Sequence, residues 1–227
     1  MRNKSSVIRK CPPFVGASTS SIRRLSDHAE VRRVARRAPV WSEAERHGFV
    51  AVVRSGILRE SLPLGEQSLT LRYCGRGDIV NLEAGYDLAP DGHVDAYEDS
   101  VVLQIPTAIF QDVIERDASI ARAAAELEAA RRQLLQTRLA MVAYRTAVQR
   151  LAACLLHLGS RFGVRDSRGT IVNLRLTHKE LAAYIGSTRE TVSFAVTDLR
   201  RDGLIQTEGK RVILLDSVAL ERLVQGK

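Results

Sequence analysis

Two helix starts follow each other closely in the C-terminal part of the sequence. Thr177 begins a T-x-x-E pattern and Ser187 begins an S-x-x-E pattern. Both are capping boxes, in which a hydroxyl and a carboxyl side chain satisfy the first free N–H groups of a helix. Gly186 lies between them and is the residue type that most often ends a helix in a left-handed turn. The spacing therefore predicts two helices that meet across a tight turn.

The second of these helices should present polar side chains at its start. Val192, Val196 and Leu199 lie at the spacing of a buried helix face. This leaves Arg189 and Glu190 exposed in the first turn. The layout is typical of a helix-turn-helix, whose second helix enters the major groove of DNA with its leading residues.

The side chains near this turn suit two kinds of DNA contact. Arg189 carries a planar fork that matches guanine O6 and N7, and Glu190 can accept a hydrogen bond from cytosine N4. Together with Ser193, they are the expected base readers. Small hydroxyl and cationic side chains instead suit phosphate oxygens. The residues expected to contact the DNA backbone are Thr177, Lys179, Ser187, Thr188, Thr191, Lys210 and Arg211.

A short hairpin should follow the two helices. Residues 204–207 and 211–215 alternate as two strands about Glu208-Gly209-Lys210, after a turn at Asp202-Gly203. This hairpin would place Lys210 and Arg211 near its tip. A winged helix-turn-helix results.

Residues 39–106 are typical of a small antiparallel β domain. Short runs rich in β-branched and aromatic residues alternate with glycine, proline and polar turns. Strands at intervals of about ten residues are typical of a sandwich, roll or barrel. The predicted strands are 49–53, 57–62, 68–73, 79–82 and 100–105.

A long helix should follow at 118–144, where one apolar seam persists for four heptads. Such a helix either packs only on its own β domain or forms a two-chain coiled coil, and we expect the second arrangement. The predicted dimer contacts are the successive a positions Ile120, Leu127, Leu134 and Met141.

The formal net charge of +8 is concentrated at the N-terminus. Residues 1–37 hold ten Lys or Arg against Asp27 and Glu30, which favours a polyanionic partner. Residues 1–21 are expected to form a flexible basic arm, although their composition also faintly resembles an organelle transit peptide. Apolar residues at helical intervals predict a short basic helix over 22–38.

The residues around the predicted turn resemble the CRP/FNR superfamily of bacterial transcription regulators. The match is LTHKELAAYIGSTRETVS at 176–193, with GLI at 203–205 and GK at 209–210; VRSG at 53–56 and GDI at 77–79 resemble turns of the family's β-roll. The resemblance implies a homodimer that binds a two-fold symmetric operator in double-stranded DNA. It also implies contact with RNA polymerase; we expect an activator, and a repressor of the same fold stays open. Separately, the odd number of cysteines without a C-x-x-C spacing favours a reducing cytoplasm.

The expected fold is α+β with four parts, the last three of which the same resemblance implies. These are the arm at 1–21, an antiparallel β-roll domain of the cyclic-nucleotide-binding type at 22–110, a dimerisation helix at 111–145 and a winged helix-turn-helix at 146–227. The residues that match Arg189 and Glu190 contact bases in the family. Phe194 departs from the family, which commonly has a base-reading arginine there, so Phe194 either touches a thymine methyl group or packs.

The sensor site departs further from the family. Cyclic-nucleotide-binding members carry a Gly-Glu-Leu run for the ribose and an Arg-Ser/Thr pair for the phosphate. The aligned residues here are Asn81-Leu82-Glu83 and about Pro90-Asp91, and Leu135-Gln136 occupy the positions of hydroxyl residues that hold the base. An acidic domain without the arginine should repel an anionic nucleotide. We therefore expect no cAMP binding and assign no cofactor.

Other sensing chemistry has little support in the sequence. Three scattered cysteines, Cys11, Cys74 and Cys154, cannot supply the four thiolates of an iron–sulfur cluster. Haem ligation by His47, His93 or Cys74 is less well supported than the alternative, in which the histidines lie at the surface and the thiol is buried. Cys74 is also a candidate redox sensor. Effector-independent activity and a redox- or small-molecule-responsive regulator both stay open.

Two other classes of protein fit the sequence less well than a sequence-specific regulator. The sequence has no P-loop, G-x-S-x-G or H-E-x-x-H pattern, so no enzyme is expected and no catalytic residue is assigned. An architectural protein would bind DNA through its basic arm with a steep salt dependence and no preferred sequence. No apolar stretch reaches the ~18–20 residues of a membrane span, and no membrane partner is expected.

Overall fold

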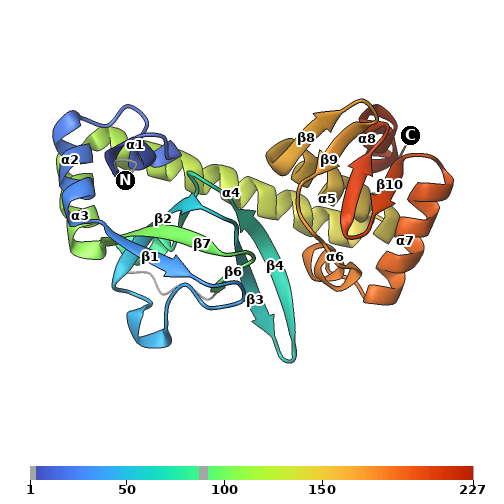
Figure 1. Cartoon of the computed structure of the whole chain (residues 1–227), viewed down its shortest axis with the longest axis horizontal. Helices are drawn as coiled ribbons and strands as arrows, with labels where there is room; N and C mark the ends of the chain where they lie inside the picture. Colours follow the sequence, from blue (N-terminus) through green and yellow to red (C-terminus); the bar gives the residue numbers. More distant parts are fainter. Residues whose placement is uncertain (1–3, 87–91, 227) are drawn as a thin grey trace. The chain divides into compact units, whose positions relative to one another are not determined.

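The computed structural model describes residues 4–86 and 92–226. The chain forms two compact units, which comprise Met1–Pro63 with Leu71–Leu134 and Leu64–Thr70 with Leu135–Lys227. Figure 1 labels most helices and strands of both, here called the N-terminal and the C-terminal unit. The N-terminal unit contains most of the β domain, and the C-terminal unit contains the helix-turn-helix with a sheet of its own. The predicted α+β class is confirmed.

The N-terminal residues fold onto their own unit. Helix α1 (Lys4–Ile8), the 3-10 turn η1 (Pro12–Phe14) and helix α2 (Thr19–His28) follow one another. Burying one apolar side chain contributes about 1.5–3 kcal/mol, and this segment buries several: Val7, Ile8, Cys11, Phe14, Ile22 and Leu25. The expectation of a flexible arm is therefore wrong for residues 4–21, because its scattered apolar residues form one buried face.

The helix expected over 22–38 ends early. Helix α2 stops at His28, and strand β1 (Glu30–Val34) pairs antiparallel with β7 (Ser100–Pro106) in the register from Glu30↔Gln104 to Val34↔Ser100. The pairing with β7 is a long-range contact that overrides the local helical spacing of the apolar residues.

Two antiparallel sheets form the β domain, in the strand orders β1-β7-β2-β5 and β4-β3-β6. The remaining strands are β2 (Phe49–Ser55), β3 (Leu58–Leu64), β4 (Gln67–Cys74), β5 (Ile79–Val80) and β6 (His93–Ala96), with 3-10 helices η2 (Glu43–Glu45) and η3 (Leu82–Tyr86). All five predicted strands are present. Among the described residues of this domain, strands β1 and β6 were not predicted by the sequence pattern.

Strand β2 shows how this unit is layered, because both of its faces are buried. Val50 and Val52 join a cluster with the N-terminal helices, whereas Phe49, Ala51 and Val53 join a second cluster with residues of both sheets. Successive side chains of a strand point to opposite faces. A nearly continuous apolar run is therefore required at β2.

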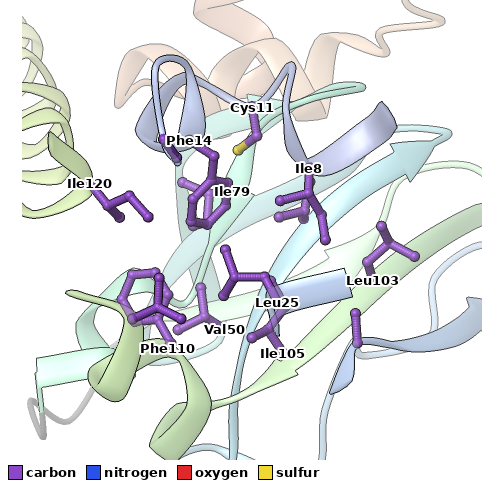
Figure 2. Close-up of a cluster of buried hydrophobic side chains, with 14 of the residues drawn as sticks. Ile8, Cys11, Phe14, Leu25, Val50, Ile79, Leu103, Ile105, Phe110 and Ile120 are labelled. Carbon is purple, nitrogen blue, oxygen red and sulfur yellow. The ribbon is translucent and has the colours of Figure 1, made fainter. Parts of the chain in front are cut away.

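The first of these clusters is drawn in Figure 2. The N-terminal segment contributes Ile8, Cys11 and Phe14, and the Phe14 ring meets the Phe110 ring edge to face with centroids 6.2 Å apart. Ile120, near the start of the long helix, is also fully buried there. The N-terminal segment is thus part of the core.

Helices α3 (Thr107–Arg116) and α4 (Ala118–Tyr144) are separated by Asp117. The Asp117 carboxylate accepts hydrogen bonds from Ser119 Oγ (2.5 Å), the Ser18 backbone N–H (3.0 Å) and Ser21 Oγ (2.8 Å). These bonds hold the pKa of Asp117 well below its usual range. Because Ser18 is the N-cap of α2, Asp117 joins the N-terminal segment to the junction of α3 and α4.

Replacing Asp117 by asparagine should destabilise the protein by about 1 kcal/mol at neutral pH, because one of the two acceptor oxygens is lost. An unfolded aspartate has a pKa near 3.9, and the folded pKa is lower. The stabilisation that the Asp117 carboxylate provides is therefore complete above the unfolded pKa and is lost as the pH falls toward the folded pKa. Urea unfolding at neutral pH and at about pH 3.5 measures both effects. Asp27→Asn, at an exposed position of α2, is the matched control; equal behaviour of the two variants would contradict the assignment.

The C-terminal unit is built on helix α5 (Ala147–Phe162). Its N-cap Thr146 forms a capping box with Gln149, so we keep 146–227 as the proposed DNA-binding domain. Its sheet has the order β10-β11-β9-β8, in which β8 and β9 pair as an antiparallel hairpin. The elements are β8 (Gly163–Asp166), β9 (Gly169–Val172), α6 (His178–Ile185), α7 (Arg189–Arg201), β10 (Ile205–Glu208), β11 (Arg211–Leu214) and α8 (Ser217–Gln225).

Candidate nucleic-acid interface

Helices α6 and α7 form the predicted helix-turn-helix. The Thr177 hydroxyl accepts a hydrogen bond from the Glu180 N–H (3.2 Å), and the Glu180 carboxylate accepts one from the Thr177 N–H (2.6 Å). Gly186 ends α6 with φ +64°, a conformation in which a side chain would be strained. The first capping box and the glycine turn are present as expected.

The start of α7 differs from the prediction by one residue. Its N-cap is Thr188, whose hydroxyl accepts a hydrogen bond from the Thr191 N–H (3.1 Å). Ser187 therefore does not form the second capping box, because the turn after Gly186 is one residue longer than the pattern suggests. The inner face of α7 is as predicted, and its buried residues are Val192, Ala195, Val196 and Leu199.

Arg189 and Glu190 are exposed in the first turn of α7. Neither side chain has a hydrogen-bond or ion-pair partner within residues 4–86 and 92–226. The N-terminal end of a helix also carries partial positive charge and free N–H groups, which favour phosphate. A guanidinium and a carboxylate are thus both available to a partner at this end.

Ser193 is placed differently from the other two predicted base readers. It is half-buried, its hydroxyl donates to the Arg189 carbonyl oxygen (3.0 Å), and it lies 2.7 Å from Nδ1 of His178. Since a serine hydroxyl has one proton, His178 must donate to it in this arrangement. The Ser193 hydroxyl already links α6 to α7, and its role as a base reader stays a prediction.

The residues predicted to contact the DNA backbone fall into two groups. The hydroxyls of Thr177 and Thr188 accept the capping hydrogen bonds of α6 and α7, and the Thr191 hydroxyl lies 2.9 Å from that of Thr188. The cationic side chains form the second group and are exposed: Lys179 on α6, and Lys210 and Arg211 at the β10–β11 turn. Ser187 is half-buried between the two helices. Only the second group offers cations to phosphates.

Two arginines that the sequence did not single out hold the end of α6. Arg150 of α5 donates to the Ile185 carbonyl oxygen (3.1 Å), and Arg138 of α4 donates to the Tyr184 carbonyl oxygen. The Arg138 guanidinium also lies over the Tyr184 ring, 4.3 Å from its centroid. Cations at these free carbonyls stabilise the C-terminal end of α6. Contacts so distant in sequence leave no local pattern by which they could be predicted.

The predicted dimer seam is wrong for its first residue, and the other three stay a prediction. Ile120 is fully buried in its own unit and is not available to a partner, whereas Leu127 is half-buried and packs in part against the same cluster. Leu134 and Met141 are half-buried. The outward apolar stripe of α4 lies beside the seam and consists of Leu135, Leu139 and Val142, which are 43%, 72% and 52% exposed.

The residues aligned with the ribose site have structural roles. Asn81 has φ +59°, and its side-chain amide donates to the carbonyl oxygens of Arg46 (2.8 Å) and Phe49 (2.7 Å). Leu82 is fully buried. Pro90-Asp91, aligned with the phosphate site, lie outside the described residues.

Charged groups in the same unit are engaged internally. Arg72 pairs with Glu60 (2.7 Å) and donates to the Ile79 carbonyl oxygen (3.1 Å), which also accepts from Arg131 (2.6 Å). Burial, together with nearby carboxylates, raises the pKa of Glu83. Both arginines thus serve the protein's own backbone and carboxylates.

The three cysteine thiols are buried. Burial raises the pKa of Cys74 to about 12 and that of Cys154 to about 12, so both are protonated near neutral pH. Cys11, expected in the flexible arm, lies in the buried cluster drawn in Figure 2.

The two histidines considered as haem ligands, His47 and His93, are exposed. Within the described ranges, His, Cys, Asp and Glu side chains form no three-membered group suited to a metal, and no helix is long and apolar enough for a membrane span.

Several known proteins resemble this chain in sequence and in fold. The profile of the Crp-like helix-turn-helix domain family matches residues 149–223. The transcriptional regulator LdrP of Thermus thermophilus is 32% identical over 197 residues, which cover 85% of this chain and 95% of that protein. The transcriptional activator protein anr of Pseudomonas aeruginosa is 27% identical over 190 residues, with coverages of 83% and 78%.

The fold has a counterpart among solved structures as well. That of FixK2 from Bradyrhizobium japonicum has a TM-score of 0.76 at 21% identity, and covers 86% of this chain and 96% of that chain. The helix-turn-helix geometry, the family profile and the likeness to LdrP over nearly its whole length agree. The chain belongs to the CRP/FNR superfamily of transcription regulators and carries its DNA-binding winged helix-turn-helix.

Proposed function

We propose that the chain acts as a homodimer that reads a two-fold symmetric operator with the start of α7. The observation that carries this proposal is the exposed pair Arg189 and Glu190, which lack partners among the described side chains, on a helix whose other face is buried. A guanidinium fork suits a guanine edge, and a carboxylate suits the cytosine amino group. Lys179, Lys210 and Arg211 hold the domain on the phosphates.

The two copies associate through the outward stripe of α4. Leu135, Leu139 and Val142 follow one another at spacings of four and three residues, which is the repeat of a coiled coil. Three large apolar side chains along one exposed helix face favour association with a second copy. Such a dimer reads two half-sites about 34 Å apart along the DNA.

Activation and polymerase contact are the further parts of the proposal. The relative anr is named a transcriptional activator, and we propose that this chain also activates transcription. It acts by contacting RNA polymerase beside its operator in the cytoplasm. No enzymatic activity is assigned, because the relatives are transcription regulators.

The regulator is proposed to be independent of cAMP and to need no effector. The Asn81 amide, where the family binds ribose, is committed to two backbone carbonyls. The buried Cys74 thiol, whose pKa is raised to about 12, disfavours the thiolate that a redox sensor needs. Control by the amount of protein is consistent with both observations.

Selection of bound DNA from a random pool, with purified protein and no added ligand, should recover a palindrome. The expected preference for it over nonspecific DNA is at least roughly a thousandfold at physiological salt. Recovery of one sequence only after a small-molecule extract is added would contradict effector independence. Uniform binding of all sequences with a steep salt dependence would instead identify an architectural protein.

A further inference from the structure

We infer that Phe194 is a specificity-determining residue that contacts the methyl group of a thymine in the operator. This inference rests on the proposed function, since it concerns the helix that enters DNA. Phe194 is 73% exposed, whereas Ala195 and Val196 beside it are buried. Its ring points away from the core of its own domain. Packing within the chain is therefore not its role.

The position of Phe194 on α7 places it over the bases. It follows Glu190 by four residues, and residues at this spacing share a helix face with Cβ atoms about 5–6 Å apart. Neighbouring base pairs are about 3.4 Å apart along the DNA axis. The ring should therefore meet a base one or two pairs away from the one that Glu190 contacts.

The chemistry of the ring selects its partner. A phenyl group neither donates nor accepts an ordinary hydrogen bond, so it cannot match the polar edges of guanine, cytosine or adenine. The thymine C5-methyl group is the apolar feature of the major groove, and contact removes both surfaces from water.

The hydroxyls beside Phe194 on the outer part of α7 are engaged within the helix. Ser193 Oγ donates to the Arg189 carbonyl oxygen (3.0 Å), and Thr197 Oγ1 donates to the Ser193 carbonyl oxygen (3.0 Å). Their protons are therefore not offered to a base. The exposed ring is left as the discriminating group at this point of the helix.

The test replaces single thymines of the selected operator by deoxyuridine, which removes only the methyl group. The wild-type protein should lose about threefold to fivefold in affinity at one thymine position of each half-site, the expected effect of one apolar carbon. Phe194→Ala should bind the thymine operator more weakly and should no longer distinguish uracil from thymine. Phe194→Leu should keep part of the discrimination. Fluorescence anisotropy at fixed salt gives each Kd.

Val218→Ala is the matched control, because Val218 is another exposed apolar residue of the same unit. It should show the wild-type sensitivity to uracil. Equal uracil sensitivity of wild type and Phe194→Ala, or no sensitivity at any thymine, would overturn the inference while the proposed function stands. If the wild-type protein prefers no sequence at all, the proposed function fails, and this inference fails with it.

Discussion

Arg189→Ala is expected to weaken binding of the selected operator by roughly 30-fold or more. Each bidentate contact between arginine and guanine contributes about 1–3 kcal/mol of discrimination, and both half-sites lose one, so the total is about 2–6 kcal/mol. Arg189 is exposed and has no partner among the described residues, so its removal should not disturb the fold. Repeating the selection with the variant should show relaxed preference at one base position of each half-site.

Two control variants separate base reading from simple loss of charge. Arg189→Lys keeps the cation but lacks the planar fork, so it should behave much more like Arg189→Ala than like the wild type. Arg200→Ala removes an exposed cation from the last turn of α7 and should weaken binding modestly for all sequences. If Arg189→Ala also weakened all sequences equally, Arg189 would be a phosphate contact.

The DNA-binding part could be predicted from sequence because its signals are local. The capping pair Thr177 and Glu180 lies within four residues, and Gly186 ends its helix through its own backbone conformation. Hydrophobic spacing likewise identified the buried face of α7. Even here, the exact N-cap was missed, because Ser187 and Thr188 are both good capping residues and the turn geometry chooses between them.

The N-terminal unit was harder to predict because several of its segments become structured only through contacts with residues distant in sequence. Residues 4–21 look polar and basic, yet Phe14 is covered by Phe110, almost a hundred residues away. Strand β1 exists because β7 offers it a partner. The heptad seam through Ile120 was identified correctly as apolar, but composition does not say whether an apolar face meets the protein's own core or a second copy.

Leu139→Glu tests which face of α4 joins the two copies. Leu139 is 72% exposed at the centre of the outward stripe, so the variant should fold normally but bring two carboxylates together in the dimer. We expect monomers at micromolar concentration in sedimentation experiments. Operator affinity should fall more than about a hundredfold, because one half-site supplies only part of the specific binding energy.

Val218→Glu makes the same change at an exposed apolar position of α8 and should leave both the dimer and operator binding intact. Ile120→Ala provides the opposite contrast, because Ile120 is buried in its own core. It should cost about 2–5 kcal/mol of folding stability while the folded fraction still dimerises. A dimeric Leu139→Glu protein with full operator affinity would place the subunit interface elsewhere. The reading of a two-fold symmetric operator would then need a different surface to hold the two recognition helices one DNA turn apart.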